Sequence, residues 1–133
     1  LRGVAEVGAG GLLRLYADRY GLDAVACRIG SFLPAPSTLR HLSTWLSPDD
    51  AVRMVEAAIT TPAPGYAVLY GISANTRAWW DLEPGRALGY EPLDDAEDHL
   101  DQITQTGRDA DEAAHVGGGF VSPELHRPAF DRA

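Results

Sequence analysis

Two side chains near the middle of the sequence could together bind a small acid. Ser31 and Arg40 lie in a loop, 30–40, that contains two prolines and follows a short apolar segment ending at Ile29. Open α/β sheets bind their ligands at the carboxyl ends of strands, where such a loop would lie. Serine offers a hydroxyl, and an arginine fork can hold a carboxylate through two hydrogen bonds. A turn-stabilising serine and a surface arginine fit the same residues, so the residues alone leave both interpretations open.

The other residues that could do chemistry form weaker patterns. Glycines at Gly8, Gly10 and Gly11 suggest a dinucleotide loop, but no strand precedes them and Leu13 occupies the third glycine position. The four histidines share no spacing typical of metal ligands, so no metal site is predicted. Cys27 lies within an apolar segment and is expected to be a buried, inert thiol. The pair Trp79–Trp80 suits packing or the mouth of a ligand site.

Composition and charge exclude several classes of protein. The chain has 133 residues and is 45% hydrophobic and 23% charged, which fits one globular domain or a piece of one. Its net charge of −8 argues against a nucleic-acid partner, and no apolar run reaches the roughly 20 residues of a membrane span. The sequence contains one cysteine and no lysine, which excludes an internal disulfide and any lysine-based mechanism. We therefore expect a reducing compartment, the cytoplasm.

Local patterns predict alternating helices and strands. A helix is expected from Val4 to Tyr20 with Gly21 as its stop, and a second helix from Ser47 to Pro62. Largely buried strands are expected over 23–29 and 66–70, and 41–46 could be a short extended segment. The second helix has a predicted core-facing stripe, which consists of Val52, Val55, Ala58 and Ile59.

This order of elements predicts an α/β fold with parallel strands. Two strands are too few to stand alone, so the chain is interpreted as the second half of a larger domain, with exposed apolar surface. Because the chain begins with Leu1, an excerpt or a truncated product is expected. Residues 81–133 carry four arginines and thirteen acids, and 107–133 show no sustained period. We expect 107–133 to be a flexible tail.

Several segments resemble one known family. The chain is similar to uronate dehydrogenases, members of the extended short-chain dehydrogenase/reductase superfamily that are close to the NAD-dependent epimerases and dehydratases. The match runs from about Leu12 to Ile103. It rests on Leu15-Tyr16-Ala17-Asp18-Arg19-Tyr20-Gly21, Arg28-Ile29-Gly30-Ser31, the run from Arg40 to Asp50, Tyr70-Gly71-Ile72-Ser73-Ala74-Asn75-Thr76, Trp79-Trp80-Asp81 and Leu88-Gly89-Tyr90.

The resemblance implies a fold, a reaction and three site residues. The fold would be the C-terminal half of a Rossmann-like doubly wound parallel sheet, over 1–106, with a small C-terminal substrate-binding region. The reaction would oxidise a uronic acid at its anomeric carbon by hydride transfer to NAD, giving an aldarolactone. By the same resemblance Ser31 contacts the substrate, Arg40 binds its carboxylate and Ile29 lies against the nicotinamide.

The chain departs from the family pattern where the catalytic pair should stand. Counting back from Ser31 without gaps places the family's tyrosine at Arg2 and its lysine at Glu6, and neither residue can serve as that acid–base pair. We therefore predict that this chain alone is inactive, does not bind NAD, and needs the missing N-terminal half as a partner. Self-association is a further expectation. The alternatives are a catalytically dead remnant that binds without turnover, and a relative of sugar-nucleotide epimerases or dehydratases.

Overall fold

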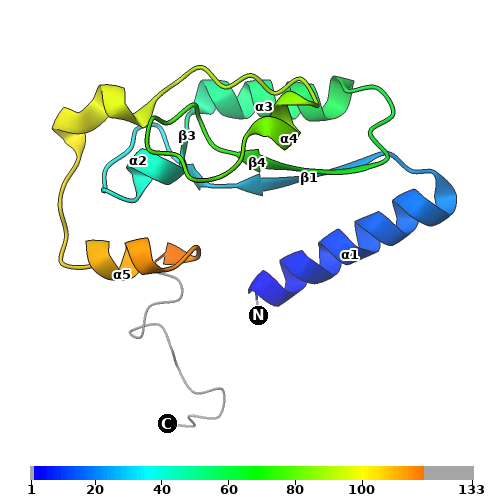
Figure 1. Cartoon of the computed structure of the whole chain (residues 1–133), viewed down its shortest axis with the longest axis horizontal. Helices are drawn as coiled ribbons and strands as arrows, with labels where there is room; N and C mark the ends of the chain where they lie inside the picture. Colours follow the sequence, from blue (N-terminus) through cyan, green and yellow to red (C-terminus); the bar gives the residue numbers. More distant parts are fainter. Residues whose placement is uncertain (1, 119–133) are drawn as a thin grey trace, which may run out of the picture.

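The computed structural model of the chain describes residues 2–118 and shows a small α/β arrangement (Figure 1). Its elements in chain order are α1 (Arg2–Tyr20), β1 (Ala24–Ile29), β2 (Ser31–Phe32), α2 (His41–Thr44), β3 (Trp45–Leu46), α3 (Pro48–Thr60), β4 (Tyr66–Gly71), α4 (Glu83–Arg86), a 3₁₀ helix (Ala96–Gln102) and α5 (Asp109–Ala114).

The strands pair in parallel, which confirms the predicted fold class. β1 pairs with β4 in a register that runs from Ala24 opposite Tyr66 to Ile29 opposite Gly71. β2 pairs with β3, with Ser31 opposite Trp45. The connection from β1 to β4 contains α3, as a parallel crossover requires. The carboxyl ends of β1 and β4 therefore lie together, and the chain leaves β1 there to form the loop that carries the predicted site.

The sheet is packed well on one side only. α3 and α4 lie on one side of β1 and β4, whereas α1 and α5 lie on the other (Figure 1). The packed side holds a core of buried residues, namely Leu46, Met54, Ala57, Leu69 and Tyr90. Strands β1 and β4 were expected to be largely buried, but most of their residues are only half-buried. The strands are less buried than predicted because α1 covers its side of the sheet only in part.

α1 begins and ends close to its predicted bounds but packs loosely. Gly21 stops it with φ of 66°, and the Gly21 N–H donates to the carbonyl of Ala17 at 3.0 Å, which confirms the predicted stop. Much of its apolar surface is exposed, including Val7 at 74%, Leu12 at 56% and Tyr20 at 61%. The expected exposure of apolar surface is thus observed.

α3 begins as predicted but presents a different face to the core. Ser47 caps the helix by accepting from the Asp50 N–H at 2.9 Å. The predicted core-facing stripe is wrong, because Val52 and Ile59 are 66% and 77% exposed and the buried residues are Asp50, Met54 and Ala57. On the inner side of α3 the Asp50 carboxylate accepts from the N–H groups of residues 93 and 94, and Met54 and Ala57 pack in the core, so the valine-rich face lies outward.

Residues 41–46, for which a short extended segment was one possibility, form α2 followed by the two-residue strand β3. Residues 109–114, which lie in the segment predicted to be a flexible tail, form helix α5 beneath α2 (Figure 1). The remainder of that segment, 119–133, lies outside the described residues.

Candidate functional site

Ile29 and Ser31 lie where the carboxyl end of β1 leads into the loop. Ile29 is the last residue of β1 and its side chain is 54% exposed, so an apolar surface is available at this edge of the sheet. Gly30 follows, and a Cβ at this position would collide with the carbonyl oxygen of Thr44 and the side chain of Ile72. Only glycine allows the chain to pass so close to α2, and this passage brings Ser31 beside Thr44.

A buried threonine joins the two predicted substrate contacts. The Thr44 side chain is almost completely buried, and its Oγ1 lies 2.9 Å from Ser31 Oγ and donates to the Arg40 carbonyl at 3.1 Å. A hydroxyl carries one proton. Because Thr44 donates its proton to the Arg40 carbonyl, it must accept a hydrogen bond from the Ser31 hydroxyl. The Ser31 hydroxyl therefore donates to Thr44 and keeps its oxygen lone pairs for a hydrogen-bond donor, such as a sugar hydroxyl.

Arg40 is anchored by backbone far away in the sequence. Its Nη1 donates to the carbonyls of Glu112 at 3.0 Å and His115 at 3.1 Å, and its Nη2 donates to the carbonyl of Val116. Partial burial lowers the pKa of Arg40, and the nearby Glu112 carboxylate opposes that shift. Since a guanidinium has five N–H groups, two donors of Arg40 have no acceptor within the described part of the chain.

Gly118 lies against the same guanidinium. Its φ is +55°, and a Cβ there would stand 2.7 Å from Arg40 Nε and 2.9 Å from Cζ. Glycine is therefore needed both for the backbone conformation and for the close approach. The segment that follows α5 thus wraps around the arginine head group and fixes where its remaining donors lie.

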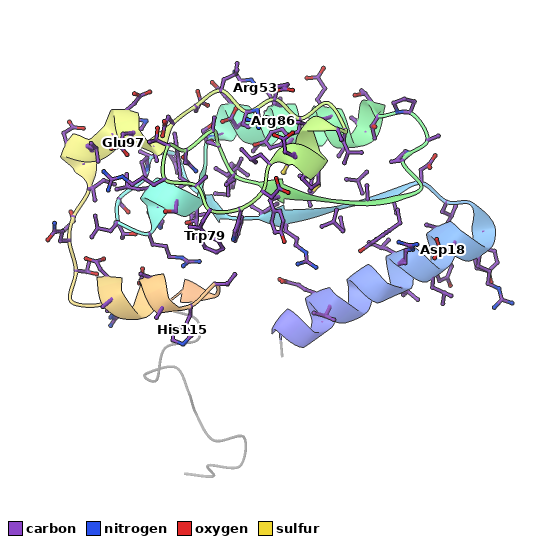
Figure 2. The ribbon with its side chains drawn as sticks, in the orientation of Figure 1. Asp18, Arg53, Trp79, Arg86, Glu97 and His115 are labelled. Carbon is purple, nitrogen blue, oxygen red and sulfur yellow. The ribbon has the colours of Figure 1, made fainter. Side chains whose placement is uncertain are left out.

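A pocket of about 290 Å³ adjoins Arg40. Its lining comes from the loop before α2, from α2 itself, from the loop after β4 and from α5, and consists of Leu39, Arg40, Ser43, Trp79, Asp109 and Ala113. Its volume is close to the lower end, roughly 300 Å³, for pockets that hold one small molecule. In Figure 2 the labelled Trp79 lies on the side of the sheet that faces α5.

A second, more open pocket of about 410 Å³ lies between α3 and the loop around Gly89. It contains none of the predicted site residues. Arg53 is one of its lining residues and is held by a 2.7 Å bond to Asp50. Across residues 2–118 no group of three or more histidine, cysteine or acidic side chains could hold a metal ion.

The two positions predicted for the catalytic pair from the resemblance lie in α1. Arg2 is the first residue of that helix and Glu6 lies one turn later. One helical turn separates them, as a tyrosine and lysine four residues apart would require. The structure therefore provides the helix for such a pair, with an arginine and a glutamate at the two positions.

Parallel strands joined by a helical crossover, with a polar loop at their carboxyl edge, place this chain among the Rossmann-like α/β proteins. Uronate dehydrogenases are among its homologues. The uronate dehydrogenase of Pseudomonas putida is 42% identical over 109 residues, which cover 80% of this chain and 41% of that protein. The sequence resemblance is thereby confirmed.

Solved structures agree with the sequence comparison. The glucuronic acid dehydrogenase of Chromohalobacter salexigens matches with a TM-score of 0.73 at 35% identity, over 84% of this chain and 44% of that one. A tyrosine-to-alanine mutant of the Agrobacterium tumefaciens uronate dehydrogenase, solved in complex with NAD, matches with a TM-score of 0.71 at 40% identity, over 77% and 40%. The chain spans less than half the length of the curated uronate dehydrogenases it matches.

The comparison with family models and the search for membrane-spanning helices both gave negative results. No protein-family model matches the chain. Among the described residues, no helix combines the length and the apolar character needed to cross a membrane.

Sequence reasoning missed two components of the site: Thr44 joins Ser31 to Arg40, and residues 112–118 hold the guanidinium. Trp79, which the sequence placed either in packing or at the mouth of a ligand site, lines the adjoining pocket. Thr44 could have been found, because it lies four residues after Arg40 and a threonine hydroxyl often bonds the carbonyl four residues earlier in a helix. The contacts of Arg40 with residues 112–118 join segments more than 70 positions apart in the sequence, and no local sequence pattern predicts them.

Proposed function

We propose that this chain supplies the substrate side of an NAD-dependent uronate dehydrogenase. In the proposed reaction a uronic acid loses hydride from its anomeric carbon to NAD and a proton from the hydroxyl on that carbon. The product is an aldarolactone. An enzyme that draws on the cell's NAD pool would work in the cytoplasm, the compartment expected from the sequence.

The observation that carries this proposal is the way in which the guanidinium of Arg40 is held. Three backbone carbonyls hold the guanidinium, and two of its N–H donors have no acceptor among residues 2–118, which is the number a carboxylate needs for a two-bond contact. A fork held in place beforehand loses little conformational entropy when the ligand binds. The pocket beside it has the volume of a small-molecule site. We assign Arg40 to the uronate carboxylate on these grounds and on the homology.

Ser31 and Ile29 receive the roles that the resemblance implies. The hydroxyl of Ser31 donates to Thr44, so its oxygen can accept from a sugar hydroxyl. The exposed side chain of Ile29 offers an apolar surface at the strand end for the nicotinamide ring. NAD, when bound there, would accept the hydride.

Proton transfer and nucleotide binding need residues that this sequence does not supply. Arg2 and Glu6 cannot replace the tyrosine and lysine that handle the proton and the ribose in the family. We propose that an N-terminal half completes the site, packed on the open side of the sheet and on the exposed apolar face of α1. The isolated chain should therefore show no NAD binding by calorimetric titration, and a micromolar dissociation constant would contradict this assignment.

A chimera tests the proposal directly. Residues Leu12–Ala133 would be fused behind the first half of an active uronate dehydrogenase that supplies the tyrosine and lysine. We expect oxidation of a uronate, and we expect Arg40→Ala to raise KM with kcat nearly unchanged if the carboxylate contact serves ground and transition states equally. With roughly 1.5–3 kcal/mol for each hydrogen bond to a charged group, kcat/KM should fall by more than tenfold.

Two variants complete this experiment. Arg40→Lys should recover only part of the loss, because an ammonium lacks the planar fork. Arg19→Ala removes an exposed arginine in the last turn of α1 and serves as the matched control. Equal activity of Arg40→Ala and the parent chimera would remove Arg40 from the site.

A second candidate function is binding of a sugar acid without turnover. It is favoured by the presence of Arg2 and Glu6 where the resemblance predicts the catalytic tyrosine and lysine. The chimera decides between the two functions, because with this second function it would remain inactive with every uronate tried.

A further inference from the structure

We propose that Trp79 is the specificity-determining residue of the pocket beside Arg40, where its indole packs against the ring of a pyranose uronate. This inference rests on the proposed function, since it takes Arg40 as the carboxylate contact. Trp79 and Arg40 line the same pocket of about 290 Å³ from different segments of the chain. Trp79 is 54% exposed, which is unusual for the largest apolar side chain.

The loop that carries Trp79 is held firmly. Buried Asn75 donates to the Trp45 carbonyl at 2.8 Å and accepts from the Ala96 N–H at 3.1 Å. Its own carbonyl accepts from the Ala78 N–H at 2.9 Å, directly before the tryptophan. Exposed aromatic groups on mobile loops are ordered only when a ligand binds, at an entropic cost. This one is placed in advance by buried hydrogen bonds.

Two further residues fasten the same loop to the acidic segment. Thr76 donates its hydroxyl to Asp95 at 2.6 Å, and Arg77 forms two bonds with Glu97, at 3.0 and 2.8 Å. Two acids of the acid-rich segment 81–133 thus secure the tryptophan loop.

Neighbouring rings fix the orientation of the indole. Trp80 contacts Trp79 edge to face, with centroids 5.3 Å apart and an interplanar angle of 83°. Trp80 itself packs on Tyr70 of β4 at 5.2 Å. The sheet therefore supports Trp80, and Trp80 supports Trp79, while the exposed part of Trp79 is left for a ligand.

The chemistry of the lining suits a cyclic sugar acid. An indole face is the negative side of the ring quadrupole, and it attracts the C–H groups of a sugar ring, whose carbons carry oxygen. Arg40 supplies two N–H donors for the carboxylate, and Ser43 has a hydroxyl with no partner among residues 2–118. Asp109 also lines the pocket, but both its oxygens accept from Thr106, at 2.6 and 3.0 Å. An open-chain acid of equal charge could satisfy Arg40 but presents no ring to the indole.

The test compares two probes on the full 133-residue chain. D-Glucuronate is cyclic and D-gluconate is open-chain, and both carry one carboxylate. We expect saturation-transfer NMR to show millimolar binding of glucuronate, with gluconate weaker by about tenfold. Trp79→Ala should abolish this preference, and Trp79→Phe should restore most of it. Arg40→Gln should weaken the binding of both probes. Tyr20→Ala, which removes an exposed ring on α1, should leave the binding of both probes unchanged.

The outcomes separate this inference from the proposed function. If Trp79→Ala keeps the preference for glucuronate while Arg40→Gln loses binding, the role of Trp79 is wrong and the carboxylate assignment stands. Absence of glucuronate binding to the parent chain also overturns the inference, and the chimera then decides the function by itself. If Trp79 had only a structural role, Trp79→Ala would weaken the binding of both probes equally, and this result would also contradict the inference.

Discussion

The hydroxyl oxygens of Ser31 and Thr44 lie 2.9 Å apart, and the Thr44 proton is committed to the carbonyl of Arg40. The pair therefore has one polarity: Ser31 donates and Thr44 accepts. The two substrate contacts implied by the resemblance, 9 positions apart in the sequence, are thus joined through one buried side chain.

We expect Thr44→Val to separate binding from stability. The Arg40 carbonyl keeps acceptor bonds from the N–H groups of residues 43 and 44, and half-buried Ser31 can turn to water. The free energy of unfolding should therefore fall by only about 1 kcal/mol, measured by urea denaturation. In the chimera the freed Ser31 hydroxyl should raise KM for a uronate. Thr44→Ser keeps the hydroxyl and should restore KM; an unchanged KM in Thr44→Val would show that the polarity of Ser31 is irrelevant.

We expect Asp50→Ala to be among the most destabilising single changes in the chain. The Asp50 carboxylate is completely buried and accepts from the N–H groups of Leu93 at 2.9 Å and Asp94 at 3.1 Å. Losing these acceptors leaves two donors unsatisfied and should cost about 2–4 kcal/mol in thermal or urea unfolding. Asp49→Ala, one position earlier and exposed, is the control and should cost far less. Similar losses in both variants would contradict the role of the buried carboxylate.

Stability should decrease on mild acidification because of His41. Its Nδ1 accepts from the N–H groups of Ser37 at 3.1 Å and Thr38 at 3.3 Å, so the neutral ring is required. Burial lowers the pKa of His41 below its usual 6.5, Glu112 opposes this shift, and Arg40 adds to it. The unfolded chain then binds the proton more readily, so the free energy of unfolding falls as the pH drops below about 6.5.

His41→Asn tests the pH effect. An asparagine oxygen can accept the same two N–H bonds but does not titrate in this range. The free energy of unfolding, measured between pH 7.5 and 5.5, should depend on pH less in this variant than in the parent. An identical pH dependence would assign the effect to other groups.

We expect Gly118→Ala to release the segment after α5 from Arg40. The new Cβ would meet the guanidinium at 2.7 Å, and the φ of +55° is unfavourable for alanine. Amide hydrogen exchange should become faster across 109–118, with little change in β1 and β4. Gly107→Ala, where nothing lies within 4 Å, is the matched control. Unchanged exchange in Gly118→Ala would show that the carbonyl contacts of Arg40 do not hold this segment.

The sequence by itself determined the elements whose signals are local. Ser47 followed by proline and two acids specifies the start of α3, since a cap, a pre-set φ and favourable charges act within four residues. Gly21 specifies the end of α1 for a similar reason. The parallel pairing of β1 and β4 followed from their separation by a helix. The residues of the strand-end loop were recognisable because they follow β1 directly.

Only the tertiary structure decided which surfaces meet. Periodicity shows that Val52 and Ile59 can share a face of α3, but in the fold the opposite residues Met54 and Ala57 pack in the core and that face lies toward solvent. The partners of Arg40 come from residues more than 70 positions away, and no local preference encodes such a contact. Trp79 is a surface residue or a pocket wall depending on where α5 lies. These features depend on contacts between elements that are distant in the sequence, so no short segment determines them.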